Sequence, residues 1–248
     1  MERFAVEVMS TPRTFRWEED LRESFRNHGL PGFWKHDRGS WSMATLDEST
    51  CSDGRADLVC ASLPKNALEG RFRDWCALIT QPTCSRVLAC LPRNSVRTEQ
   101  FLAQRVGVAD QSLRRTLRNM VRAGLLCDVG GGRYHLDDHF VVPPIEIASF
   151  EFKLSNWRRA LYQATRYRSF SHRVYVVLPV ESSQIAAENS NQFRSLNIGL
   201  IAHDCEGHCH QLVRPRKREP TARYRMIMAL GALIGADQAR RRSQIGNR

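Results

Sequence analysis

The stretch that decides the fold runs from residue 145 to residue 179 and reads IEIASFEFKLSNWRRALYQATRYRSFSHRVYVVLP. Its first part, residues 145–153, predicts a strand whose side chains point to opposite faces in turn. Residues 156–170 carry the apolar spacing of a helix, with Ser155 as the expected N-cap. Residues 173–178 are rich in β-branched side chains and predict a second strand. The stretch therefore predicts a strand, a helix and a strand in direct succession.

The regions on either side continue this mixture of helices and strands. The elements expected before the stretch are a helix over 14–27 that stops at Gly29 and Pro31, and strands over 39–46 and 55–62 joined at Ser52-Asp53-Gly54. The elements expected after it are a short helix over 192–196, a hairpin over 198–203 and 208–213, and a last helix over 221–235.

Residues 85–136 have a different character. The elements expected there are helices over 86–91 and 98–106, a third helix from 110 to Gly124, and strands over 125–129 and 133–136. The run TEQFLAQRVGVADQSLRRTLRNMVRAGLL at residues 98–126 resembles a winged helix-turn-helix domain. This resemblance implies that the last helix enters the major groove of DNA and that the wing touches the backbone. The DNA-contacting residues it implies are Arg114, Arg115, Arg118 and Arg133. Winged helices also serve as protein-docking modules, which is the alternative.

Charge is concentrated in two segments. The chain of 248 residues has 37 Lys and Arg against 26 Asp and Glu, a net charge of +11. Residues 85–136 carry nine arginines and three acidic residues, and residues 214–248 carry ten basic and two acidic residues. Such an excess favours a polyanionic partner, most often nucleic acid. A solvated basic surface is the alternative.

Composition also excludes several classes. Hydrophobic residues make up 42% of the chain, which is ordinary for a globular protein. No apolar run approaches the roughly 20 residues that span a bilayer, and no signal-peptide core opens the chain. The 8 cysteines include no pair with CxxC spacing. We therefore expect a cytoplasmic protein with free thiols and no membrane partner.

The residues best suited to chemistry are Glu151-Phe152-Lys153. Glu151 and Lys153 lie two apart on the predicted strand, so they share a face. A carboxylate can hold a divalent metal, and a lysine can orient or deprotonate an attacking water or stabilise developing charge. Asp57, on the strand over 55–62, is the best second carboxylate. A Glu–Lys pair on a solvated strand face is the alternative.

With residues 85–136 set aside, the predicted order is helix, three strands, helix and strand. This αβββαβ order resembles the core of the PD-(D/E)xK (restriction-endonuclease-like) nuclease superfamily, an α+β or α/β fold with a mixed sheet. The resemblance places Asp57 on the second core strand and Glu151 and Lys153 on the third. It implies that Asp57 and Glu151 bind Mg²⁺ or Mn²⁺ and that Lys153 acts with the attacking water.

Two further features agree with this superfamily. Gln163 and Tyr167 lie four apart on the next helix and resemble the QxxxY motif of RecB-type nucleases, in which both residues support the site. In many members a glutamate of the first helix adds a metal contact. Glu19 and Glu23 are candidates for that role here. Ordinary helix surface is the alternative for Gln163 and Tyr167, and stabilisation of the helix dipole is the alternative for Glu19.

The chain departs from the superfamily pattern in two ways. Ala56 stands where a proline often precedes the aspartate. A gap of 93 residues separates Asp57 from Glu151. We explain the gap by insertion of the winged helix between core strands two and three. If that explanation fails, Glu146 or Asp138 becomes the partner acid.

The predicted organisation has four segments. They are the first part of the core at 1–82, the winged helix at 83–140, the second part of the core at 141–235, and a basic tail at 236–248 that binds phosphate or only adds solubility. Zinc is not expected at residues 203–210, because the spacing of the ligand types matches no common knuckle. Those ligand types are His203, Cys205, His208, Cys209 and His210.

The predicted function is metal-dependent cleavage of DNA, as an endonuclease or other phosphodiester hydrolase in restriction, defence or repair. DNA is the expected partner, with protein subunits or a second copy of the chain as further candidates. The alternatives are a non-catalytic DNA-binding protein that keeps the nuclease fold and a docking subunit of a larger complex. Substrate form and sequence specificity stay open.

Overall fold

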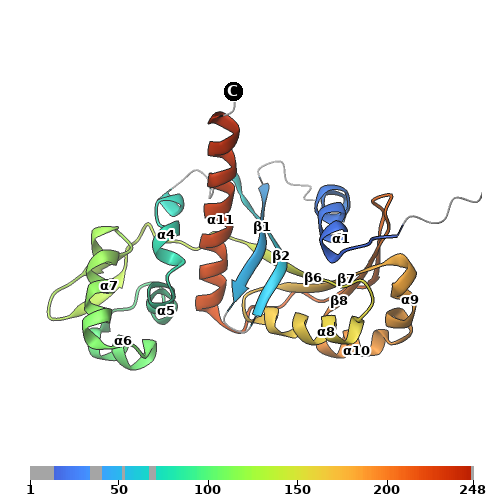
Figure 1. Ribbon diagram of the computed structural model, residues 1–248. Coiled ribbons are helices and arrows are strands. Elements are labelled where there is room, and N and C mark those ends of the chain that lie inside the picture. Colours follow the sequence, from blue (N-terminus) through green and yellow to red (C-terminus); the bar gives the residue numbers. More distant parts are fainter. Residues whose placement is uncertain (1–13, 34–40, 52–53, 67–70, 247–248) are drawn as a thin grey trace, which may run out of the picture.

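The computed structural model describes residues 14–33, 41–51, 54–66 and 71–246, and its centre is a mixed sheet of six strands (Figure 1). The strand order is β1-β2-β6-β7-β8-β9. Neighbouring strands are antiparallel except for β6, β7 and β8, which run parallel. The strands are β1 Trp41–Cys51, β2 Gly54–Pro64, β6 Glu146–Phe152, β7 Arg173–Pro179, β8 Gly199–His203 and β9 Cys209–Val213. The protein is thus of mixed α/β architecture, compatible with an α+β fold.

Helices bury both faces of this sheet, which explains why the central strands are almost wholly apolar. Leu21 and Phe25 of the N-terminal helical region pack on one face, against Phe150 and other side chains of β6. The opposite face belongs to the larger core and is covered by the other helices. These helices are α8 Trp157–Thr165, η3 Arg166–Ser169, α9 Val180–Glu188, α10 Ser190–Leu196 and α11 Arg223–Gly246.

The first helix continues past the stop predicted at Gly29 and Pro31. It comprises α1 Glu18–Ser24, the π-helical turn η1 Phe25–Gly29, and α2 Leu30–Phe33. The prediction of a stop was wrong because a π-helical turn shifts the hydrogen bonding just before Pro31. The N–H of Leu30 bonds to the carbonyl of Phe25, five residues back. A proline, which has no N–H, is tolerated at such an irregular point.

A second group of elements lies between β2 and β6 in sequence, although these two strands are direct neighbours in the sheet. Its small sheet has the order β3-β5-β4 and lies with α6 and α7 at the far left of Figure 1. Its elements are η2 Arg71–Arg73, α4 Cys76–Ile79, α5 Pro82–Cys90, β3 Arg97–Thr98, α6 Glu99–Val106, α7 Asp110–Arg122, β4 Leu126–Asp128 and β5 Arg133–Leu136. Thr98 caps α6, and Gly107 makes the turn to α7 with a positive φ of 68°.

Helix α11 joins this group to the sheet, since it packs against α4 and α5 on one side and against β1 on the other (Figure 1). It continues to Gly246 and so takes in most of the predicted basic tail. The guanidinium of Arg240 donates a hydrogen bond to the Thr45 hydroxyl at 2.6 Å. The expectation of a tail distinct from the last helix is therefore corrected: its first eleven residues are helical.

Other sequence expectations are met with shifted ends. Ser52 and Asp53 of the predicted hairpin turn lie outside the described residues, but Cys51 pairs with Gly54. The hairpin of β8 and β9 is present, and α9 is a helix that the sequence analysis did not predict. No helix of the described ranges combines the length and apolarity needed to cross a membrane.

Candidate active site

Glu151 is a buried carboxylate near the end of β6, with an exposed fraction of only 1%. One carboxylate oxygen, Oε2, accepts a hydrogen bond from the hydroxyl of Tyr167. The other, Oε1, lies 3.3 Å from Nζ of Lys153 but makes no hydrogen bond. Burial, followed by the negative charge of Asp57, raises the pKa of Glu151 to about 7. A further positive charge beside Glu151 would therefore stabilise its ionised form.

Asp57 reaches the same place from the neighbouring strand β2. Its Oδ2 accepts a hydrogen bond from the backbone N–H of Phe152 at 2.9 Å, just beyond the last paired residues of β2 and β6. Burial raises the pKa of Asp57, although this hydrogen bond and the charge of Lys153 oppose the shift. The antiparallel pairing of β2 and β6 thus brings together two carboxylates that are separated by 93 residues in sequence.

Lys153 follows β6 directly and points to the same side as Glu151. Its Nζ donates hydrogen bonds to Oε2 of Glu18 at 2.9 Å and to the carbonyl of Phe152 at 2.9 Å. Burial lowers the pKa of Lys153, but the bond with Glu18 and the charges of nearby carboxylates outweigh it, so the pKa is raised. The ammonium therefore holds its proton at neutral pH.

Gln163 lies on α8, and Tyr167 on η3 reaches the carboxylate of Glu151. Tyr167 is 1% exposed, and its hydroxyl lies 2.9 Å from the carbonyl oxygen of Arg55 as well as beside Glu151. Oε1 of Gln163 is buried and makes no hydrogen bond. The helical spacing therefore places both side chains on the inner side of the helix, facing the sheet.

Glu19 is not brought to this group. It pairs with Arg22 at 3.3 Å and lines a separate hollow of about 260 Å³ that also includes Glu23. Glu18 takes the place beside Lys153 instead, which the sequence analysis missed. The signal was present, because residue 18 lies on the helical face that carries the buried Leu21 and Phe25.

The two alternative acids considered from the sequence do not join the group either. Glu146 opens β6 and pairs with Arg173 at 2.5 Å and with Lys217 at 3.4 Å, about five residues away from Glu151 along the strand. Asp138 lies after β5, outside the six-stranded sheet. Asp57 remains the acid that lies next to Glu151.

The oxygen donors of this group suit a hard divalent cation. Mg²⁺ and Mn²⁺ prefer carboxylate and carbonyl oxygens. Asp57 and Glu151 supply the carboxylates, and Oε1 of Glu151 is buried and makes no hydrogen bond, its one close cation being Nζ of Lys153 at 3.3 Å among the described residues. Buried polar atoms without a partner are costly, so a ligand that satisfies them is favoured. The residues present therefore fit a divalent metal.

The four arginines singled out from the sequence lie on α7 and β5. Arg115 and Arg118 are exposed and form no ion pair with another described residue. Nε of Arg114 pairs with Glu99 at 2.7 Å, so this guanidinium already has an acidic partner. Arg133 uses its Nε to bond the carbonyl of Gly130 at 3.3 Å, at the tip of the hairpin of β4 and β5.

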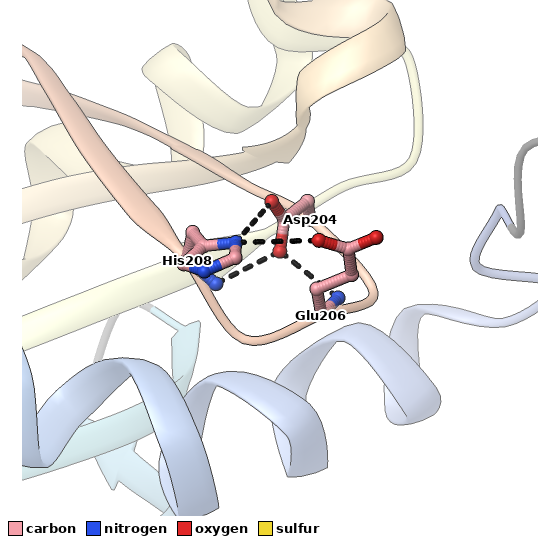
Figure 2. Close-up of side chains that lie close together, drawn as sticks. All are labelled: Asp204, Glu206 and His208. Carbon is pink, nitrogen blue, oxygen red and sulfur yellow. Dashed lines mark hydrogen bonds and ion pairs between the residues drawn. The ribbon is translucent and has the colours of Figure 1, made fainter.

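A second group of ligand-type side chains could hold a metal ion, namely Asp204, Glu206 and His208 in the turn between β8 and β9 (Figure 2). Their ligand atoms lie within 4.8 Å of one another. Asp204 Oδ1 accepts the backbone N–H groups of Glu206 and His208 at 2.9 and 2.8 Å, and its Oδ2 lies 3.0 Å from His208 Nδ1. These hydrogen bonds stabilise the turn without a metal ion. The spacing of the His and Cys residues predicts no zinc site here, and it does not involve the two acids.

Comparison with protein-family models, with curated proteins and with solved structures finds no match to this chain.

Proposed function

We propose that this protein is a metal-dependent DNA nuclease. One observation carries the proposal: Asp57 of β2, Glu151 of β6, Lys153 directly after β6 and Tyr167 of η3 meet at one end of the sheet, where Oε1 of Glu151 is buried and makes no hydrogen bond. A purely structural Glu–Lys pair has no need of a second, half-buried carboxylate, which raises the pKa of the first. Perturbed carboxylates of this kind are typical of functional sites.

The proposed roles follow from the positions and charges of the side chains. Asp57 and Glu151 would hold Mg²⁺ or Mn²⁺. The cation would polarise the scissile phosphate and neutralise part of its developing charge. Lys153 keeps its proton, so Nζ acts as a hydrogen-bond donor that orients water or stabilises negative charge, and it does not act as the base. Tyr167 fixes Glu151 through Oε2, and Gln163 offers a free amide oxygen.

The chain topology supports this proposal. The order of α1, β1, β2, β6, α8 and β7 is the αβββαβ order expected for a PD-(D/E)xK core, and β2 and β6 pair across the long gap in sequence. The helices α5, α6 and α7 with the small sheet β3-β5-β4 have the element order of a winged helix. We propose that this inserted part binds DNA through Arg115, Arg118 and Arg133, with Arg114 freed from Glu99 on binding.

The experiment is a cleavage assay with Lys153→Met on linear, circular and single-stranded DNA, in Mg²⁺, Mn²⁺ or EDTA. We expect cleavage only with metal, and a loss of at least roughly 100-fold in Lys153→Met, since one charged stabilising group typically contributes that much. Lys65→Met is the matched control, because Lys65 is exposed and distant in the fold from the site.

Full activity of Lys153→Met, or cleavage that survives EDTA, would contradict the proposal. DNA binding without cleavage under any metal would favour the alternative of a non-catalytic DNA-binding or docking subunit.

A further inference from the structure

A row of three arginines follows β9 and is not used by the proposed active site. Arg214, Arg216 and Arg218, the arginine row, alternate along residues 214–220, a segment without helix, turn or bend. All three are exposed, whereas Pro215 between them is buried. Alternate residues of an extended chain are about 6.6 Å apart, which is close to the separation of consecutive phosphates along a nucleic-acid strand.

The backbone of this segment is held by three contacts to other elements. The side-chain amide of Asn197 bonds Arg216 twice, accepting its N–H at 2.8 Å and donating to its carbonyl at 2.9 Å. Arg173 donates to the carbonyl of Pro215 at 2.6 Å, and the N–H of Arg218 bonds the carbonyl of His172 at 3.1 Å. The backbone that carries Arg216 and Arg218 is therefore fixed before any ligand arrives, which lowers the entropic cost of binding.

The charge of the arginine row is not neutralised within the described part of the chain. No carboxylate there forms an ion pair with its guanidiniums, and Glu146 is already paired with Arg173 and Lys217. The row borders a hollow of about 430 Å³ together with Arg194, and none of the residues lining this hollow is acidic. Concave sites of one charge sign concentrate ligands of the opposite charge.

We propose that the arginine row binds the phosphodiester backbone of one nucleic-acid strand, with successive guanidiniums facing successive phosphates. The planar fork of arginine matches the oxygens of a phosphate. The choice of a nucleic acid over another polyanion rests on the proposed nuclease function. The row adjoins the starts of β7 and β6, about 16 Å along the sheet from Glu151, so it extends the substrate contact beyond the catalytic site.

The test is the binding of a labelled single-stranded oligonucleotide in EDTA, measured by fluorescence anisotropy over a range of salt concentrations. The triple variant Arg214→Gln/Arg216→Gln/Arg218→Gln should bind at least about tenfold more weakly at low salt. The slope of log K against log salt should fall by about 2, since each phosphate contact on a single strand contributes about 0.7. The triple lysine variant should keep the slope, because its charges remain.

The matched control is Arg73→Gln/Arg159→Gln/Arg242→Gln, which removes the same charge from exposed positions on three different elements. An equal loss in the control and in the arginine-row variant would overturn the inference, and so would a wild type that does not bind the strand. Stronger binding of polyglutamate than of the oligonucleotide, lost in the arginine-row variant, would overturn the assignment in favour of an acidic protein.

These outcomes are distinguishable from failure of the nuclease proposal. Binding through the row without cleavage under any metal leaves this inference standing and contradicts the proposed function. Metal-dependent cleavage by the wild type, together with unchanged DNA binding by the arginine-row variant, would support the proposed function and contradict this inference.

Discussion

The buried carboxylate of Glu151 is the residue at which stability and function are expected to conflict. Its raised pKa means that the ionised form is disfavoured in the fold without metal. The folded state therefore holds a proton between the ordinary pKa near 4.5 and the folded pKa of about 7. Stability is full below that window, falls as pH rises through it, and stays reduced above it.

The first prediction is that Glu151→Gln stabilises the protein in EDTA at pH 8 while abolishing cleavage. A neutral amide avoids the cost of a buried charge beside Asp57, which we put at about 1–3 kcal/mol. Urea unfolding of the variant and the wild type at pH 5 and pH 8 measures the difference. The gain should shrink at pH 5, where the wild-type carboxyl is mostly protonated. A variant less stable than the wild type at both pH values would contradict this account.

Some contacts of the candidate site could be predicted from the sequence, and others could not. Glu151 and Lys153 could be predicted to share a face because strand periodicity is strictly local. The pairing of Asp57 with Glu151 could not follow from local rules, since it depends on strand register across a long insertion. Helical spacing places Glu18 on the face of Leu21 and Phe25, but its bond with Lys153 depends on how the helix packs on the sheet, which local rules do not give.

At the scale of elements, the arginines of α7 differ in whether they already form an ion pair. Arg115 and Arg118 are exposed, whereas Arg114 is paired with Glu99. Contact with a phosphate breaks no ion pair of Arg115 or Arg118, but it requires Arg114 to give up its bond with Glu99. We therefore expect the two free arginines to contribute more to duplex binding than Arg114.

The second prediction is that Arg115→Gln/Arg118→Gln lowers the salt slope of duplex DNA binding by about 1.8, or 0.9 for each lost phosphate contact. Arg114→Gln should change it by less. Anisotropy titrations with a labelled duplex in EDTA provide the measurement, and Arg73→Gln is the control for charge alone. Equal slopes in all variants would exclude α7 from the DNA interface and favour its use as a protein-docking surface.

The π-helical turn of the first helix brings Gly29 against β9. A Cβ at this position would lie 2.4 Å from Sγ of Cys209 and 2.9 Å from Cδ2 of Phe25. Contacts this short force neighbours to move, and overpacking of a core typically costs about 1–3 kcal/mol. The close approach explains why a glycine stands inside a helix, where it was expected to be a stop.

The third prediction is that Gly29→Ala destabilises the fold by about 1–3 kcal/mol, measured from the midpoint of urea unfolding. Gly32→Ala is the matched control on the same helical region, since a Cβ there meets nothing within 4 Å. The control should be neutral or slightly stabilising, because alanine favours a helix more than glycine does. Equal stability of the two variants would show that the helix does not pack closely against β9.

The boundaries of elements were predicted less well than their types. Strands and hairpins have local signals in alternation and turn residues, so β7 and the hairpin of β8 and β9 agree with expectation. The stop at Gly29 and the end of α11 depend on packing. Gly29 is inside a helix because of its tertiary contacts, and α11 continues to Gly246 while it packs against α4, α5 and β1.

At the scale of the whole molecule, the inserted elements share a core with the sheet. One cluster of buried side chains contains Leu117 of α7, Leu88 of α5, Leu230 of α11 and Val176 of β7. Helix α11 lies between the two parts in Figure 1 and contacts both. A domain with its own separate core would unfold by itself, whereas elements that share one core unfold together.

The fourth prediction is therefore that the inserted part and the six-stranded sheet unfold in one cooperative transition, coupled through α11. Leu230→Ala should cost about 2–5 kcal/mol, as buried leucine truncations do. Hydrogen exchange followed by mass spectrometry should show an equal loss of protection for the amides of α7 and of β7, although Leu230 belongs to neither element. Arg223→Ala, at an exposed position of the same helix, should leave both unchanged. Loss of protection in α7 alone would mean that the inserted part is an independent domain, and its arginines would then reach DNA without a fixed relation to Glu151.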